Sequence, residues 1–268
     1  MIETASFQTN LIFQSGLLTA YILGLSFILG TVFGSFFNCM AWRIAHHESI
    51  VSGRSHCAVC GHPLSAADLV PVFSYLLLKG RCRYCGEKIH PRYMISELLL
   101  GISFDICVLK WGISPECLRG MILFCILLTL SLVDLDCFVI PNSLQIAGII
   151  NFAVFLPFVS GGIRSNLLGG LIGGLGIAGG ILLISLLFDR ISGRESMGGG
   201  DIKLYFVTGL YLGPLNGLLC VLVSCVFGLL FSAFMKSRRI PFGPSISAAA
   251  ALCLLTGQGI VNWYLNLL

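Results

Sequence analysis

Long apolar runs separated by short polar segments dominate this sequence. Runs long enough to cross a bilayer, roughly 17 to 25 residues each, lie at about 17–42, 93–110, 117–135, 144–160, 165–188, 215–235 and 244–266. A shorter apolar run lies at about 201–213. With the short run counted as a crossing, the pattern predicts an all-α polytopic membrane protein of about eight transmembrane helices.

Composition supports this class. The 268 residues are 56% hydrophobic and only 10% charged, and their mean hydropathy is +0.94, far from the soluble globular range. Residues 1–15 contain Glu3 but no Lys or Arg. They therefore lack the basic start of a cleaved signal peptide, and we expect the first run to remain as an anchor. The bilayer, and not nucleic acid, is the expected partner.

Basic residues predict the orientation. With eight crossings, one side of the membrane receives residues 43–92, 134–143, 189–200 and 236–243. Thirteen of the 16 basic residues fall on or beside that side, and three fall opposite, namely Lys110, Arg119 and Arg164. The thirteen are Arg43, Arg54, Lys79, Arg81, Arg83, Lys88, Arg92, Arg190, Arg194, Lys203, Lys236, Arg238 and Arg239. The positive-inside rule makes that side cytoplasmic and puts the N-terminus outside.

The polar loop 44–92 carries two C-x-x-C pairs, "CAVC" and "CRYC". Cys57, Cys60, Cys82 and Cys85 have the spacing of a tetrahedral four-thiolate zinc site. A loop this small needs such a stabilising centre. We therefore expect three parts: a first transmembrane helix at 1–43, a cytoplasmic zinc-binding domain at 44–92, and a membrane domain at 93–268.

The cysteines also allow another interpretation. A disulfide or redox pair is the alternative to zinc, although a reducing cytoplasm disfavours stable disulfides. The nearby His56, His62 and His90 are expected bystanders, because four cysteines already fill the coordination shell. The other eight cysteines have no ligand spacing and are expected to be small buried hydrophobic residues.

Glycines four residues apart in "NLLGGLIGGLGIAGG" predict close packing between helices. The pairs are Gly169 with Gly173, Gly170 with Gly174, and Gly176 with Gly180. This is a packing feature and not evidence of function.

Carboxylates near apolar runs are default functional candidates, because ionisable groups are costly at membrane depth. Asp134 and Asp136 end the third predicted helix on the cytoplasmic side, and Asp201 opens the sixth from the same side. Two aspartates in a partly desolvated site tend to share one proton. Such a pair can activate a water for attack on a carbonyl, which is the chemistry of aspartic proteases.

The segment "MGGGDIKLYFVTG" places Gly198, Gly199 and Gly200 directly before Asp201. We expect these glycines to leave room for an extended substrate, whose backbone would pair with theirs like an added strand. The alternative for Asp201 is a helix N-cap, with Lys203 marking the membrane interface.

The remaining acidic residues have simpler expected roles. Asp136 is either a supporting or a substrate-contacting residue. Glu97 lies near the cytoplasmic start of the second predicted helix. For Asp105 a structural contact between helices is preferred over catalysis, and Asp189 is expected to pair with Arg190 at the interface.

Five segments, in this order, resemble the type IV prepilin peptidase family over nearly the whole chain. They are "GTVFGSFFNCMAWR", the two-knuckle stretch from "HCAVC" to "SELLLG", "VDLDCFVIPN", "GGGDIKLYFVTGLYLG" and "IPFGPSISAAAA". "IPN" stands where many members have proline followed by aspartate, which weakens any choice among subfamilies.

The resemblance implies cleavage of type IV prepilins or pseudopilins between a basic leader and a hydrophobic helix, at the cytoplasmic face of a bacterial inner membrane. It assigns catalysis to Asp134 and Asp201. Around this pair, the residues expected to bind the substrate or shape the site are Gly198, Gly199, Gly200, Lys203, Asp136 and Glu97. It also implies methylation of the new N-terminus with S-adenosylmethionine. It leaves the oligomeric state unknown.

Two other functions compete with a peptidase. In a transporter or proton-coupled channel, the carboxylates would relay ions and the glycines would line a path. In a non-enzymatic scaffold, the zinc knuckles would present a surface to cytoplasmic partners, and only cysteine substitutions would matter.

Overall fold

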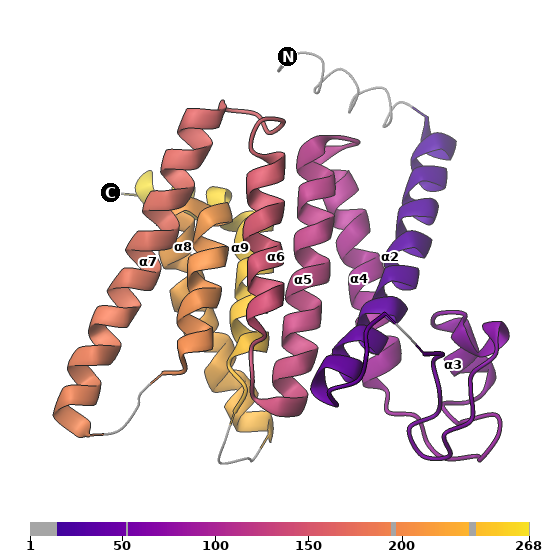
Figure 1. Ribbon diagram of the computed structural model, residues 1–268. Helices are drawn as coiled ribbons and strands as arrows, with labels where there is room; N and C mark the ends of the chain where they lie inside the picture. Colours follow the sequence, from indigo (N-terminus) through magenta and orange to yellow (C-terminus); the bar gives the residue numbers. More distant parts are fainter. Residues whose placement is uncertain (1–14, 52, 194–196, 236–239, 268) are drawn as a thin grey trace. The chain divides into compact units, whose positions relative to one another are not determined.

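The computed structural model describes residues 15–51, 53–193, 197–235 and 240–267. The expectations for the first 14 residues, and for Arg194, Lys236, Arg238 and Arg239, lie outside this part of the chain. The described residues are helical, apart from loops and two isolated β-bridges, and contain no strand (Figure 1). The elements are α2 (Gly16–Ala45), η1 (Ala66–Leu69), α3 (Phe73–Leu77), α4 (Arg92–Trp111), α5 (Pro115–Cys137), α6 (Asn142–Phe155), α7 (Ile163–Ser192), α8 (Gly199–Met235) and α9 (Gly243–Leu265).

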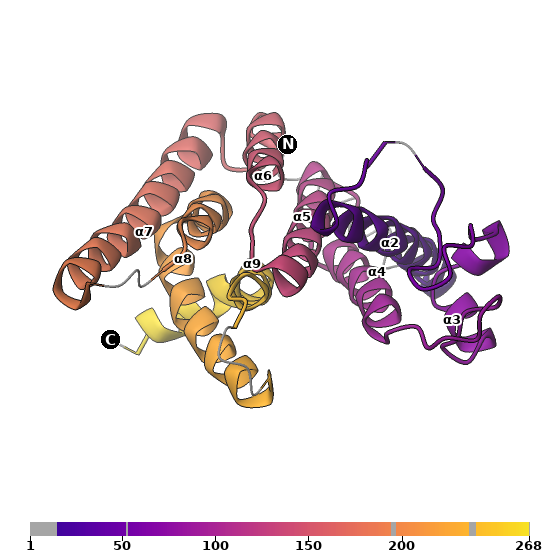
Figure 2. The ribbon, with the colours of Figure 1, turned by 60° about the horizontal axis from the view of Figure 1, so that its bottom comes forward.

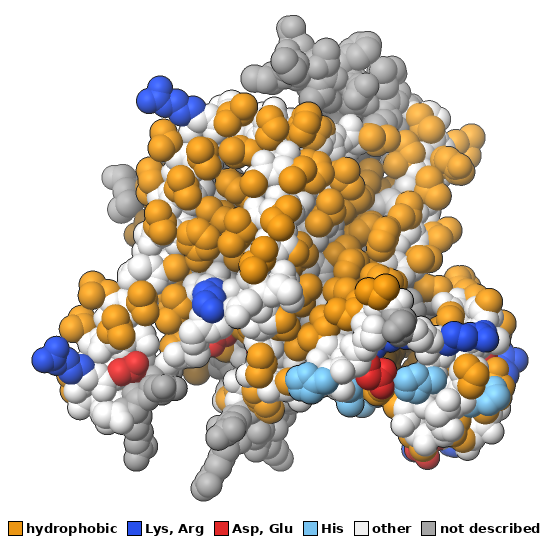
Figure 3. All heavy atoms as spheres, in the orientation of Figure 1, with side chains coloured by type: hydrophobic (Ala, Val, Ile, Leu, Met, Phe, Trp, Pro, Cys, Tyr) orange, Lys and Arg blue, Asp and Glu red, His pale blue; other side chains and the backbone are white. Residues whose placement is uncertain are grey.

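Hydrophobic side chains cover the outward faces of these helices (Figure 3). Within the described residues, five helices are long and apolar enough to cross a membrane, namely α2, α5, α7, α8 and α9. The shorter α6 is apolar but has 14 residues. A multi-pass membrane protein accounts for this pattern, because large apolar surfaces are stable only when lipid covers them.

The chain divides into two compact units, Met1–Leu132 and Val133–Leu268, with the boundary inside α5. In the first unit, α2 packs against α4. A side chain at Gly30 would place its Cβ 2.7 Å from the Cα atom of Gly101, and one at Gly34 would come within 2.8 Å of the Cα atom of Glu97. Small residues therefore set the close approach of these two helices.

Glycines of α7 pack closely against α8 in the second unit (Figure 2). A Cβ atom at Gly170, Gly173 or Gly174 would lie within 3 Å of a backbone oxygen of α8. Gly169, Gly176 and Gly180 instead face open space, with nothing within 4 Å. The predicted packing is thus confirmed for one face of the glycine-rich helix only.

Helix α8 reverses direction between Gly199 and Met235. Gly213 has a φ of 70° and a ψ of −174°, and Pro214 follows it. Tyr205 and Ser224, 19 residues apart, hydrogen-bond through their hydroxyl groups. In a continuous helix this separation would be about 28 Å. The chain therefore folds back at Gly213, and the apolar runs expected at 201–213 and 215–235 form the two arms of a hairpin.

Candidate functional site

Asp134 lies in the last turn of α5 and is buried, with 4% of its surface exposed. Its Oδ2 atom accepts a hydrogen bond of 2.8 Å from the backbone N–H of Gly243. Gly243 is the first residue of α9. The carboxylate thus sits at a helix N-terminus, where free N–H groups and the helix dipole favour an acceptor with negative charge.

Gly243 has no side chain because there is no room for one. A Cβ atom there would lie 2.7 Å from the Oδ2 atom of Asp134. Pro244 follows in the first turn of α9, where a missing N–H costs nothing. Sequence reasoning noted "IPFGPS" as a motif but did not single out Gly243. The Gly-Pro pair at the start of an apolar run is the sequence feature that could have marked Gly243 as the start of a helix.

Asp201 lies in the first turn of α8, in the same unit as Asp134. It is partly buried, and its charge interacts with that of Asp134. The helix begins at Gly199, so Asp201 is its third residue and not the N-cap residue. The structure therefore brings the two predicted catalytic carboxylates within electrostatic range, although 67 residues separate them in sequence.

The start of α8 is held by the start of α6. Gln145 is buried and donates a hydrogen bond of 3.1 Å from its Nε2 atom to the carbonyl oxygen of Gly200. The Nζ atom of Lys203 donates one of 2.9 Å to the Oδ1 atom of Asn142. Neither Asn142 nor Gln145 was predicted as a site residue. The buried amide orients the backbone next to Asp201.

The three glycines before Asp201 have different surroundings. A Cβ atom at Gly199 would meet nothing within 4 Å, whereas one at Gly200 would lie 3.2 Å from the Cβ atom of Ile140. One at Gly198 would lie 3.3 Å from the Oδ2 atom of Asp201. Gly200 therefore allows close packing against the segment after α5, and Gly199 borders open space.

The other predicted carboxylates lie elsewhere. Asp136 is exposed, two residues beyond Asp134. Glu97 is a buried residue of the first unit, and its Oε2 atom accepts a hydrogen bond of 2.8 Å from the backbone N–H of Val72. Asp105, also in the first unit, faces Ser26 of α2. Its expected role as a structural contact between helices stays a prediction.

The four predicted metal ligands converge. The Sγ atoms of Cys57, Cys60, Cys82 and Cys85 all lie within 4.8 Å of one another, and those of Cys57 and Cys85 are 3.9 Å apart. Tetrahedral coordination with Zn–S bonds near 2.3 Å needs sulfur atoms about 3.8 Å apart. The donor set therefore fits a four-thiolate metal centre.

The cysteines are all free thiols, so no disulfide competes with this arrangement. Among the described residues, no histidine belongs to the cluster. His62 instead packs on Tyr84, with ring centroids 3.7 Å apart, and His56 packs on Trp42. His56 and His62 thus pack on aromatic rings and lie outside the cluster.

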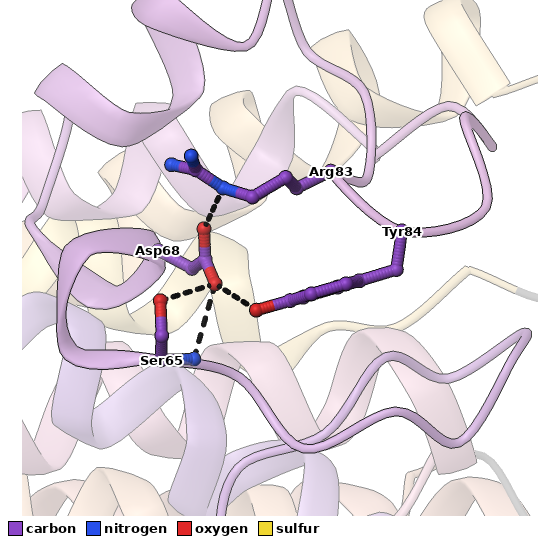
Figure 4. A network of polar contacts seen from close by, with 4 residues as sticks. All are labelled: Ser65, Asp68, Arg83 and Tyr84. Carbon is purple, nitrogen blue, oxygen red and sulfur yellow. Dashed lines mark hydrogen bonds and ion pairs between the residues drawn. The ribbon is translucent and has the colours of Figure 1, made fainter.

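A carboxylate ties the second knuckle to the segment before α3 (Figure 4). The Oδ2 atom of Asp68 accepts hydrogen bonds from the N–H and hydroxyl of Ser65 and from the hydroxyl of Tyr84. Its Oδ1 atom accepts one of 2.7 Å from the Nε atom of Arg83. The hydroxyl of Ser65, more than any other contact, holds the pKa of Asp68 well below its ordinary value. Sequence reasoning missed this residue, which no spacing rule marks.

The thiols of the cluster differ in acidity. Burial raises the pKa of Cys57, but hydrogen bonds from the backbone of Cys60 and Val59 and from neighbouring thiols outweigh it and bring the pKa to about 7. At Cys85, a hydrogen bond from the backbone of Glu87 lowers the pKa. Burial and contacts with the other three thiols raise it more, to about 12. Without metal, the cluster therefore retains protons at neutral pH.

Most of the chain matches known prepilin peptidase sequences. Residues 28–111 match the model of the bacterial peptidase A24 N-terminal domain, and residues 121–233 match that of the type IV leader peptidase family. A relative from Bacillus subtilis, named prepilin leader peptidase/N-methyltransferase, is 32% identical over 92% of this chain and 99% of its own length. Relatives of the same name from Aeromonas salmonicida and Neisseria gonorrhoeae are 36% and 28% identical. They cover 80% and 93% of this chain, and 75% and 96% of their own lengths. No solved structure matches.

Proposed function

This chain belongs to the type IV leader peptidase family, and we propose that Asp134 and Asp201 are the catalytic pair with which it removes the leader peptide of type IV prepilins. It is a prepilin leader peptidase with N-methyltransferase activity, as its relatives are named. The observation that carries the assignment is the placement of the two carboxylates. Asp134 is buried against Gly243. Asp201, in the first turn of α8, interacts electrostatically with Asp134.

The pair acts on one water molecule. The N–H of Gly243 occupies the Oδ2 atom of Asp134, so we assign the water to the Oδ1 side. Two close carboxylates share one proton, so one of them is charged. The charged aspartate removes a proton from the water while the oxygen of that water bonds to the scissile carbonyl carbon. The protonated member donates its proton to the carbonyl oxygen. When the C–N bond then breaks, the aspartate that took the proton from water gives it to the leaving nitrogen, and an O–H of the tetrahedral intermediate returns a proton to the other aspartate.

The substrate backbone is proposed to run beside Gly198 and Gly199, where no side chain stands between it and Asp201. This is supported by the open space at Gly199. Lys203 and Asp136 are both exposed near the same helix ends, and we propose that they border this path. A basic leader would be attracted to the carboxylates while its hydrophobic helix stays in lipid. For Glu97, the hydrogen bond to Val72 supports a role in holding the metal-binding loop.

For the membrane arrangement, we infer eight crossings, with the loop 44–92 and the carboxylate pair on the cytoplasmic side of the inner membrane. The reversal of α8 at Gly213 supports counting its two arms separately. The distribution of basic residues supports the orientation. The three parts 1–43, 44–92 and 93–268 then correspond to an anchor, a metal-binding domain and the peptidase domain.

We infer that the metal held by the four cysteines is zinc, because a closed four-thiolate set is typical of structural zinc sites. Bound zinc would stabilise the fold of the loop. The methyl donor is proposed to be S-adenosylmethionine. Loop 44–92 has no glycine-rich dinucleotide-binding motif, so no residue is assigned to that cofactor.

A gel-shift assay of prepilin cleavage in membranes tests the catalytic pair. Asp134→Asn and Asp201→Asn should each reduce cleavage by about 10²- to 10⁴-fold, the usual effect of losing a general acid or base. Asp189→Asn, which removes a carboxylate from α7, is the matched control and should cleave normally. Undiminished cleavage by either of the first two variants would rule out the dyad. Altered ion flux with normal cleavage would indicate a transporter.

A further inference from the structure

The short helix α3 of the metal-binding loop carries an apolar face that no described residue of the first unit covers. Phe73, Leu76 and Leu77 are 67%, 58% and 81% exposed. Their spacing of three and four residues puts them on one side of the helix. Leu69 and Val70, just before α3, are also exposed. Large apolar groups gathered in this way on a polar domain mark an interaction surface.

The opposite side of α3 faces the metal-binding knuckles. Tyr75 packs so closely on Gly80 that a Cβ atom at Gly80 would lie 2.9 Å from the tyrosine ring. The hydroxyl of Tyr75 donates a hydrogen bond to the carbonyl oxygen of Ile89, beyond the second knuckle. Because this inner face is fixed, Phe73, Leu76 and Leu77 cannot turn inward to bury themselves in the loop.

The start of α3 is tied to α4, which is one of the eight crossings in the proposed membrane arrangement. Val72 precedes α3, and its N–H donates to the carboxylate of Glu97. Glu97 lies five residues into α4, about 7 Å along the helix axis from Arg92. Val72 has a φ of 62°, an unfavourable conformation for a β-branched residue, which persists where neighbouring contacts enforce it. The contact therefore ties the start of α3 to the first two turns of α4.

The net charge of the segment that carries this face complements an anionic membrane surface. Residues 65–90 contain four basic residues, Lys79, Arg81, Arg83 and Lys88, against two acidic ones. All four basic residues are exposed. Apolar side chains flanked by Lys and Arg are typical of helices that lie in the interface of anionic bilayers. The outer faces of α2 and α4, to which this loop is joined at both ends, are themselves apolar and exposed.

We propose that α3 is an interfacial membrane anchor, whose Phe73, Leu76 and Leu77 insert at the boundary between the headgroups and acyl chains of an anionic bilayer. The anchor holds the metal-binding loop against the membrane instead of leaving it free in solution. The knuckles are then kept beside the surface from which a membrane-embedded substrate must emerge.

Fluorescence quenching in proteoliposomes tests this proposal. The full-length Phe73→Trp variant is reconstituted in phosphatidylcholine brominated on its acyl chains, mixed with phosphatidylglycerol. Val59→Trp is the matched control, because Val59 lies on the first knuckle and is 68% exposed. Emission of the three native tryptophans is subtracted with wild-type protein. Metal content and prepilin cleavage, measured on each variant, establish that it is folded.

The added emission of Phe73→Trp should be blue-shifted. It should lose most of its intensity with bromines near the headgroups and less with bromines near the chain ends. Val59→Trp should show neither effect. Unquenched, solvent-like emission from folded Phe73→Trp would overturn the proposal, as would equal quenching at both positions. A blue shift that appears only when prepilin is added would assign the face to the substrate helix instead.

Discussion

The Oδ2 atom of Asp134 lies 2.8 Å from the backbone nitrogen of Gly243, across 109 residues of sequence. This hydrogen bond joins the end of α5 to the first residue of α9 and fixes one carboxyl oxygen in place. A catalytic carboxylate needs such support, because activity depends on its position to within a fraction of an ångström. The bond thus links the packing of two helices to the chemistry of the site.

Gly243→Ala should disable the site without unfolding the protein. Its Cβ would lie 2.7 Å from the Oδ2 atom of Asp134, so the carboxylate must move. We expect kcat for prepilin cleavage to fall by about 10- to 100-fold. Gly259→Ala is the control, because Gly259 lies in the same helix with nothing within 4 Å. Equal kcat values for the two variants would show that Gly243 does not position Asp134.

Gly200→Val should impair cleavage through packing, because its side chain would be forced against Ile140, 3.2 Å from the Cβ position. The double variant with Ile140→Ala should recover part of the lost cleavage, since it restores the missing space. Gly199→Val faces open space and should instead raise KM for prepilin while thermal stability is unchanged. Steady-state kinetics and melting curves separate the two effects. Failure of Ile140→Ala to rescue would exclude the packing explanation.

Gly173→Ala should destabilise the second unit by about 1–3 kcal/mol, the usual cost of overpacking. Its Cβ would lie 2.5 Å from the carbonyl oxygen of Gly209. Gly176→Ala, on the open face of the same helix, should be neutral or slightly stabilising. Unfolding in detergent measures both. Similar stabilities would mean that α7 and α8 are not in close contact.

Metal binding should strengthen as pH rises. The pKa of Cys57 is about 7 and that of Cys85 about 12 without metal, so zinc must displace protons at neutral pH. Competition with a chelator should give an affinity that increases from pH 6 to pH 9. Cys57→Ser should lose about one zinc per chain. A pH-independent affinity would contradict binding through thiolates.

Asp68→Asn should loosen the metal centre by about 10-fold or more in zinc affinity, because Asp68 orients Arg83 and Tyr84 beside the ligands. The pKa of Asp68 is depressed below its ordinary value of 3.8. The ionised Asp68 carboxylate therefore stabilises the folded loop fully above pH 3.8. This stabilisation is lost only as the pH falls through the lower pKa of the folded state. The ratio of the zinc affinities of wild type and Asp68→Asn should therefore be constant from pH 8 to pH 5. Asp68→Glu tests whether the carboxylate alone restores binding.

By itself, the sequence determined the class of the protein and the identity of its chemical groups. Apolar run lengths specify helices locally, so most were predicted within a few residues. Two C-x-x-C pairs were enough to name the metal ligands, since each pair is a local turn. Asp134 and Asp201 stand out in the sequence because an ionisable group beside an apolar run costs free energy and therefore indicates a functional role.

Only the tertiary structure decided which groups meet. Three hydrogen bonds join separate segments of the chain: Gly243 to Asp134, Gln145 to Gly200, and Arg83 to Asp68. No local periodicity encodes such contacts, because they depend on how helices pack. The same holds for the glycines. Gly173 and Gly176 are alike in sequence, yet only Gly173 has a helix backbone against it.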